Sequence, residues 1–208
     1  MKLVVLGATG GTGLEIVRRA VDRGHAVTAF VRSPQALEKF ADRISIVQGD
    51  LLNGVELGRI IAGHDGVLSG FGPRLPVLKA DAHLLQQFAG TLTDAMQHLD
   101  TKRVIVLSVA FLFRDSIFPP AYLLGRLLFP GIVADAAAME NVVQRSGLDW
   151  TLVRPPKLTD KPYTGKYRFE AGHLPRFGFS ISRADVADFM LKTVNEPASI
   201  GKIIGVSN

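Results

Sequence analysis

Glycines at every third position follow the first apolar segment of the chain, and they constrain its fold more than any other feature. Leu3 to Leu6 are apolar residues typical of a buried strand, and the glycines stand at positions 7, 10 and 13. An amphipathic run from Leu14 to Val21 then predicts a helix. Glycines between a strand and a helix permit a sharp turn, close approach of backbone to a pyrophosphate, and tight packing of helix on sheet. The pattern therefore favours a dinucleotide-binding turn over a plain structural turn.

The phosphates of such a ligand are expected at the amino end of this helix, where backbone N–H groups are free and the helix dipole is positive. The predicted contacts are the residues of the turn itself: Gly7, Thr9, Gly10, Gly11, Thr12 and Gly13.

Strand-like and helix-like segments alternate along the rest of the chain. Alternation of this kind predicts βαβ units with right-handed crossovers, and so an α/β fold with a doubly wound parallel sheet in a three-layer α/β/α arrangement. We expect one domain over residues 1–208, with the carboxyl ends of the strands lining one crevice. The expected strands are 26–31, 44–47, 65–69, 103–107, 148–153 and 202–206, and the expected helices are 34–40, 57–61, 81–98, 135–146 and one capped by Ser182.

The composition is that of a globular protein, with 47% hydrophobic and 21% charged residues. The absence of cysteine excludes disulfides and thiolate metal sites, and we expect no metal site and a cytoplasmic location. With the first strand starting at residue 2, we expect no signal peptide. The net charge is +5, but no run of Lys or Arg exceeds two residues, so a phosphate-bearing cofactor explains the charge better than nucleic acid does.

The residue after the second strand indicates which dinucleotide is bound. Folds that bind NAD usually place a carboxylate there, on the ribose 2′-hydroxyl. This chain has Arg32 and Ser33, which suit a 2′-phosphate and therefore predict NADP(H). The alternative is that Arg32 is an ordinary surface arginine.

Other residues at strand ends are candidates for the same crevice. Asp50 is expected either to accept a hydrogen bond from the adenine amino group or to cap a helix, and Leu51 is expected to cover the adenine ring. Ser108 follows the fifth strand and is the candidate catalytic residue, in an orienting role. The remaining candidates are Ser69, Gly70 and Pro155 for the cofactor and Arg74 for the substrate.

Residues 111–133 are unusually apolar but are interrupted by prolines and arginines, which argues against a membrane span. Three interpretations stay open for them: a lid over an apolar substrate, a patch covered by a partner subunit in an oligomer, or core. Phe111 and Phe113 are expected to form an apolar substrate wall or to pack internally. We expect the substrate side of the crevice to be built from residues 109–133 and 155–182.

Over its whole length the chain resembles the atypical short-chain dehydrogenase/reductase superfamily, and within it the NADPH-dependent flavin reductase / biliverdin-IXβ reductase group with its bacterial NmrA-like relatives. The resemblance rests on the order and spacing of short motifs, and it implies a Rossmann fold, NADPH, and hydride transfer to flavins or open-chain tetrapyrroles. The motifs are Gly-Ala-Thr-Gly-Gly-Thr-Gly at 7–13, Val31-Arg32-Ser33, Gly49-Asp50-Leu51, Ala110-Phe111-Leu112, Ser146-Gly147-Leu148, Arg154-Pro155-Pro156, Thr164-Gly165 and Ile181-Ser182-Arg183.

The chain also departs from this superfamily. None of its tyrosines, at 122, 163 and 167, has a lysine four residues later, so the usual Tyr-x-x-x-Lys pair is absent. Val109 stands where the flavin-reductase group commonly has a second hydroxyl residue, and Ala136 replaces its histidine. Ser108 alone is too weak an acid to protonate an alkoxide, which favours acceptors that delocalise charge.

Two functions of different classes follow from these features. The first is an oxidoreductase that uses NADPH to reduce a flavin, a quinone or another conjugated acceptor. The second is a non-catalytic NmrA-like redox sensor that binds NADP(H) and signals to a partner. A third idea, nucleic-acid binding, is weaker because no recognition motif is visible.

Overall fold

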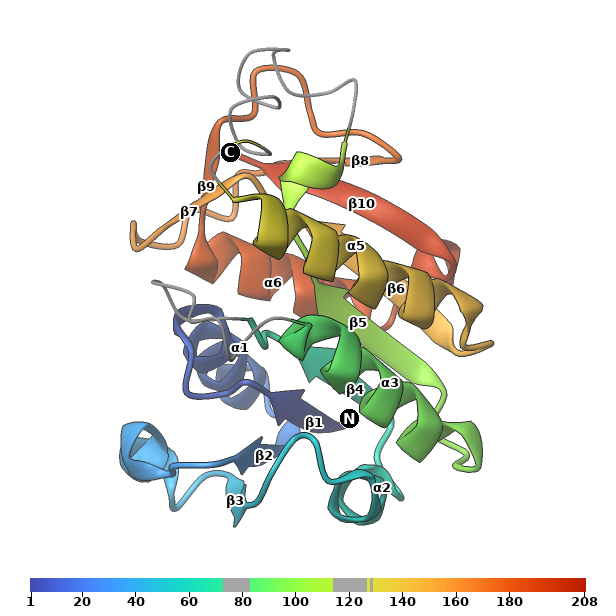
Figure 1. Cartoon of the computed structure of the whole chain (residues 1–208). Helices are drawn as coiled ribbons and strands as arrows, with labels where there is room; N and C mark the ends of the chain where they lie inside the picture. Colours follow the sequence, from blue (N-terminus) through green and yellow to red (C-terminus); the bar gives the residue numbers. More distant parts are fainter. Residues whose placement is uncertain (73–82, 114–126, 128) are drawn as a thin grey trace.

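A mostly parallel sheet forms the centre of the molecule (Figure 1). The computed structural model describes residues 1–72, 83–113, 127 and 129–208. Within these residues the sheet has eight strands in the order β3-β2-β1-β4-β5-β6-β10-β8, and only β8 runs antiparallel to its neighbour. The strands are β1 Lys2–Leu6, β2 Ala26–Val31, β3 Ser45–Gln48, β4 Gly66–Ser69, β5 Arg103–Leu107, β6 Asp149–Arg154, β8 Arg168–Ala171 and β10 Lys202–Ser207.

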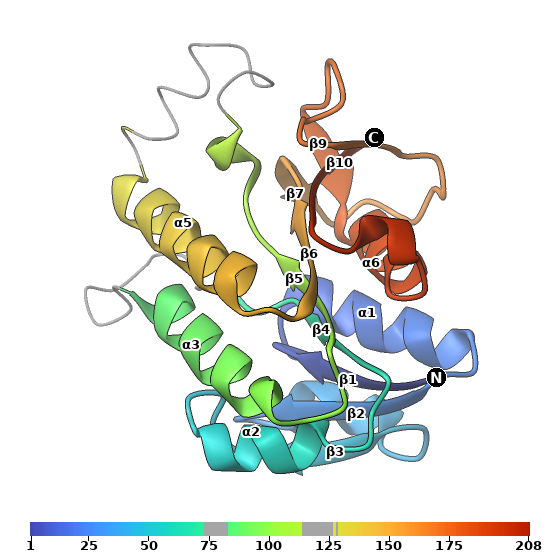
Figure 2. The same ribbon diagram turned by 90° about the vertical axis from the view of Figure 1, so that its right-hand side faces the viewer.

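Helices cover both faces of this sheet, as expected for a doubly wound fold (Figure 2). Helices α1 (Gly11–Asp22) and α6 (Arg183–Thr193) pack together on one face. Helices α2 (Gly54–Ile61), α3 (Leu84–Gln97) and α5 (Pro130–Arg145) lie on the other. The α/β prediction is therefore confirmed.

Alternating side chains of the strands supply the two halves of the core. Leu3 and Val5 of β1 point toward α1 and α6, whereas Val4 and Leu6 belong to the cluster under α2, α3 and α5. All four are fully buried, as the central strand of a two-sided sheet requires. Smaller elements complete the fold: the short pair β7 (Lys157–Thr159) and β9 (Ser180–Ser182), and the 3₁₀ turns η1 (Gln35–Phe40), η3 (Ala110–Leu112) and η4 (Pro197–Ser199).

Helix α5 begins at Pro130, so the predicted start at Asp135 is wrong. Proline suits this first helical position because its φ is preset and no N–H is lost from the helix ladder. The Asp135 side chain instead accepts hydrogen bonds from the backbone N–H groups of Leu85 (2.9 Å) and Gln86 (3.0 Å) and so caps α3.

The other boundaries differ less from expectation. Strand β6 ends at Arg154, one residue beyond the expected strand 148–153. The expected helix at 34–40 is a 3₁₀ turn, and α3 lies inside the expected range 81–98, whose residues 81 and 82 fall outside the described residues. Among the described residues, no helix has both the length and the apolar character needed to cross a membrane.

Candidate functional site

The glycine turn between β1 and α1 is packed too tightly for side chains at two of its positions. Gly7 has a φ of +69°, and a methyl group there would lie 2.7 Å from the backbone N and Cα of Phe71. A methyl group at Gly13 would lie 2.1 Å from the carbonyl oxygen of Gly7. The loop after β4 and the first turn of α1 therefore close directly on the turn, as predicted for a dinucleotide-binding fold.

The amino end of α1 is open to an anion. Gly10, the N-cap, offers no side-chain acceptor, and the first turn contains no acidic residue. Gly10 and Gly11 are exposed, Thr9 is half-buried, and Thr12 is buried. A helix terminus without a cap leaves its N–H groups and its positive dipole end available to a phosphate. This cradle fits the diphosphate of a dinucleotide.

The parallel strands bring the predicted site residues to one edge of the sheet. Strands β1 to β6 pair in parallel register, so their carboxyl ends share an edge. The residues that follow these strands and lie on this edge are Gly7, Arg32, Asp50, Gly70, Ser108 and Pro155. Arg74, the predicted substrate residue, lies outside the described residues.

Arg32 and Ser33 are exposed at the end of β2. The carbonyl oxygen of Arg32 accepts a hydrogen bond from Gln48 Nε2 at 3.0 Å, which ties this loop to β3. Within the portion of the chain that the structure describes, the Arg32 guanidinium makes no ion pair. Its charge is therefore available to an incoming anion.

The Asp50 carboxylate accepts a hydrogen bond from the backbone N–H of Leu52 at 3.0 Å. Helix α2 is capped by Asn53, whose side chain accepts from Glu56 N at 3.3 Å, so the interpretation of Asp50 as the cap is wrong. Leu51 is only 6% exposed and packs in the core, which leaves it little surface to offer a ligand.

Ser69 and Gly70, at the end of β4, lie next to the glycine turn. Ser69 is fully buried, and its hydroxyl accepts a hydrogen bond from the backbone N–H of Phe71 at 3.4 Å. A methyl group at Gly70 would lie 3.0 Å from the backbone N of Gly13. Ser69 has no surface for a ligand, whereas the Gly70 backbone lies beside the turn.

Ser108, Glu140 and Arg154 form a buried polar network at the carboxyl ends of β5 and β6. Of the three, only Ser108 was predicted from the sequence as a site residue. The Ser108 hydroxyl donates to Glu140 Oε1 at 2.5 Å. Arg154 donates to the same oxygen through Nε at 2.8 Å and to Oε2 through Nη2. The Glu140 side chain is 3% exposed and the Arg154 side chain 10%. Glu140 Oε1 therefore accepts two hydrogen bonds, and the Ser108 hydroxyl proton is engaged in one of them.

A hollow of about 400 Å³ opens between η3 and α5, beside this network. Phe111 lines it, and its role as a substrate wall stays a prediction. Phe113 is buried, and its ring centroid lies 4.5 Å from the Arg154 guanidinium carbon, so it packs beneath the network. Pro155 is also buried, and its carbonyl oxygen accepts from Ala110 N at 3.1 Å. The full lining is Phe111, Leu112, Pro130, Val133, Ala134, Ala137, Glu140, Asn141, Gln144 and Arg154.

Two buried aspartates of α6, Asp185 and Asp188, bind the loop at residues 163–167. Asp185 accepts from the backbone N–H groups of Thr164 (3.0 Å) and Gly165 (2.9 Å) and from Ser182, the predicted and confirmed cap of this helix. Burial alone would raise the pKa of Asp185, but hydrogen bonds, the largest from Asn208 and Ser182, outweigh it and lower that pKa.

Asp188 has the same role and lies about one helical turn later in α6. It accepts from Tyr167 at 2.6 Å and pairs with Lys192 at 2.9 Å and with Arg23. Burial opposes ionisation, but the hydrogen bonds from Tyr167 and Lys192 and the charge of Arg23 hold the pKa of Asp188 below its ordinary value. The same burial and the Asp188 contact raise the pKa of Tyr167. These contacts fix residues 163–167 against α6.

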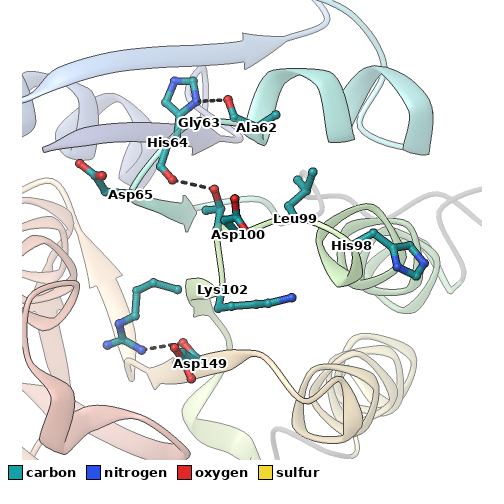
Figure 3. A pocket seen from close by; sticks show the side chains of 11 residues that line it. Ala62, Gly63, His64, Asp65, His98, Leu99, Asp100, Lys102 and Asp149 are labelled. Atoms are coloured by element: carbon teal, nitrogen blue, oxygen red, sulfur yellow. Dashed lines mark hydrogen bonds between the residues drawn. The ribbon is translucent and has the colours of Figure 1, made fainter.

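A larger hollow, of about 670 Å³, lies at the opposite, amino-terminal edge of the sheet (Figure 3). Some of its polar groups bond to one another: Thr101 donates to the His64 carbonyl at 2.6 Å, and Arg103 donates to the Asp149 carbonyl at 2.8 Å. Burial lowers the pKa of Arg103 to about 10, although Asp149 raises it to some extent. Because Arg103 also binds the last carbonyls of α6, Thr193 O at 2.6 Å and Val194 O at 3.2 Å, it joins that helix to the sheet.

Comparison with known proteins identifies the family of this chain. Residues 7–197 match the family of NAD(P)H-binding proteins. The chain belongs to this NAD(P)H-binding family. The resemblance seen in the sequence and the predicted nicotinamide dinucleotide cofactor are thereby confirmed at the level of NAD(P)H. Among the described residues, no group of three or more His, Asp or Glu side chains is placed to hold a metal ion.

Individual relatives extend this result. An uncharacterized chloroplastic protein of Arabidopsis thaliana is 30% identical, over 99% of this chain and 76% of the relative. A short-chain dehydrogenase/reductase of Veillonella parvula, solved in complex with NADP, superposes with a TM-score of 0.80 at 18% identity, over 100% of this chain and 94% of that one. ChuY, an anaerobillin reductase of Escherichia coli O157:H7, gives a TM-score of 0.80 at 21% identity, over 100% and 97%. At these identities the two structures establish the Rossmann fold alone.

Proposed function

We propose that this protein is an NADPH-dependent oxidoreductase that reduces a flavin, a quinone or another conjugated acceptor by direct hydride transfer. One observation carries the proposal: an uncapped helix terminus for phosphates shares a sheet edge with a buried Ser108–Glu140–Arg154 network and the hollow beside it. The solved NADP complex of a structural neighbour and the reductase activity in the name of another support the same assignment.

Arg32 and Ser33 support NADPH over NADH. Both are exposed after β2, and neither they nor Pro34 and Gln35 provide a carboxylate for a ribose 2′-hydroxyl. A guanidinium without an ion pair among the described residues can bind a 2′-phosphate through charge-assisted hydrogen bonds. Asp50, at the end of β3, is our candidate for the adenine amino group.

Ser108 orients a bound group rather than delivering a proton. Its hydroxyl proton is donated to Glu140, so the oxygen presents only acceptor capacity to the crevice. The nicotinamide, when bound, supplies the hydride. A conjugated acceptor spreads the resulting charge and takes its proton from solvent, whereas a simple carbonyl needs a positioned acid. Phe111 and the rest of the hollow would hold the acceptor, and the segment at 155–182 would close the substrate side.

Because the Ser108 hydroxyl proton is already donated to Glu140, the site has no obvious proton donor for a substrate among the described residues. This also favours the second candidate, a sensor that binds NADP(H) without turnover. One assay separates the two functions: the protein is mixed with NADPH and, in turn, riboflavin, FMN and menadione, and absorbance at the nicotinamide band is followed. Steady consumption of NADPH supports the reductase. Tight NADPH binding with no consumption on any acceptor rejects the reductase and supports the sensor.

A further inference from the structure

Arg183, the first residue of α6, lies directly on the amino end of α1. A methyl group at Gly11 would lie 2.7 Å from Arg183 Cδ and 2.8 Å from its Nε. The side chain can take this position only because residue 11 is a glycine, and it borders a hollow of about 190 Å³ that Gly11 also lines. Sequence reasoning did not single out Arg183 as a site residue, because most of the chain separates it from the turn.

The charges around Arg183 are unbalanced. A cation beside the amino end of a helix is unfavourable, because that end carries the positive end of the dipole. Here Arg183 lies at the amino end of α1, whose first turn has no acidic residue. Its ion-pair partner among the described residues is Asp160, at 2.6 Å, whose side chain is 88% exposed. An ion pair this exposed is weak. The arrangement lacks a strong counter-ion.

We infer that Arg183 binds the pyrophosphate of the dinucleotide, exchanging the Asp160 carboxylate for it. This inference rests on the proposed placement of the cofactor at the glycine turn. A diphosphate at the amino end of α1 would neutralise both the helix terminus and the guanidinium, and Arg can bind phosphate oxygens at two points. Breaking the Asp160 pair costs little because water already screens it.

Arg183 and Arg32 therefore have separable roles. The pyrophosphate is common to NADPH and NADH, so Arg183 strengthens the binding of both equally. Arg32 faces a phosphate that only NADPH carries. Asp160 competes with the pyrophosphate for Arg183, and its removal should tighten the binding of both dinucleotides.

Dissociation constants for NADPH and NADH, measured on the full chain, test this assignment. In Arg183→Met both constants should rise by about tenfold or more, with Arg183→Lys between Met and wild type. In Asp160→Asn both should fall by about two- to fivefold. Arg18→Met is the matched control, because Arg18 lines the same hollow but pairs with Glu15, and its constants should stay within about twofold of wild type.

Several results would overturn the assignment. They are an unchanged NADH constant in Arg183→Met, an equal loss in Arg18→Met, or an Arg183→Lys protein no better than Arg183→Met. A thermal unfolding midpoint close to that of wild type shows that the variants are folded. If the wild-type protein binds neither dinucleotide, the proposed function fails together with this inference. If it binds both and Arg183→Met is silent, this inference alone fails.

Discussion

At the scale of single residues, we propose that Arg32 determines the choice of cofactor. We expect Arg32→Asp to weaken NADPH binding by about 1.5–3 kcal/mol or more while sparing NADH, because the variant loses a charge-assisted contact and places a carboxylate near the 2′-phosphate. Titration with each dinucleotide measures this. Lys202→Asp makes the same charge change at the start of β10. This position lies at the amino ends of the parallel strands, opposite the glycine turn, so both affinities should stay unchanged. Equal weakening of NADPH and NADH in Arg32→Asp would refute the role assigned to Arg32.

Glu140 illustrates the cost of disrupting a buried ion pair. Glu140→Ala leaves the Arg154 guanidinium buried without its carboxylate, and we expect a loss of about 3–5 kcal/mol in the free energy of unfolding. Glu15→Ala removes a partly exposed carboxylate that pairs with Arg18 and Arg19 along α1, and it should cost about 1 kcal/mol or less. Urea denaturation of the two variants gives the comparison. A loss as small in Glu140→Ala as in Glu15→Ala would mean that the network adds little to stability.

At the scale of secondary-structure elements, contact between α1 and the turn before it depends on Gly13. Gly13→Ala would bring a methyl group within 2.1 Å of backbone, which moves only if α1 moves, and we expect this variant to lose several kcal/mol of stability. Gly90→Ala, in α3, meets no atom within 4 Å and should gain about 0.5–1 kcal/mol from helix propensity. Thermal unfolding of both distinguishes the effects, and a stable Gly13→Ala protein would contradict the packing described for the turn.

The elements that were predictable are those whose signals are local. Strands β2 and β5 have their predicted bounds, because each is a short, mostly apolar run rich in β-branched residues. Ser182 caps α6 through a hydrogen bond within its own turn. The start of α5 was missed because the Pro130 signal lies within an apolar, proline-rich stretch. Asp135 could not be identified as the cap of α3, since that contact joins residues 50 positions apart.

The candidate site was predictable in the same uneven way. The glycine turn and the strand-end residues could be placed from spacing and from the geometry of parallel strands. The partnership of Glu140 with Ser108 spans 32 positions, and the contact of Arg183 with Gly11 spans the length of the fold. No periodic pattern marks such pairs. These pairs can be recognised only once the sheet order is known, because it brings the carboxyl ends of β1, β5 and β6 to one edge.

At the scale of the whole molecule, Asp185 and Asp188 couple stability to pH. Folding lowers the pKa of both carboxyls, so the unfolded chain takes up protons first as the pH falls. Their stabilising contribution is therefore complete above the ordinary pKa of 3.8 and is lost as the pH falls toward the lower folded-state values. Free energies of unfolding measured from neutral pH down into the acid range should show this loss, and Asp188→Asn should show a smaller one. A pH dependence unchanged in the variant would rule out Asp188 as a contributor.

The whole arrangement also implies that cofactor binding stabilises the fold, because α1, the loop after β4 and α6 all meet at the glycine turn. Calorimetric titration of the folded protein with NADPH and with NADH, paired with thermal unfolding in each ligand, is the most direct test of a dinucleotide at this turn. We expect both ligands to bind and to raise the unfolding midpoint, NADPH more than NADH. No heat and no shift of the midpoint with either ligand would contradict a dinucleotide at the amino end of α1.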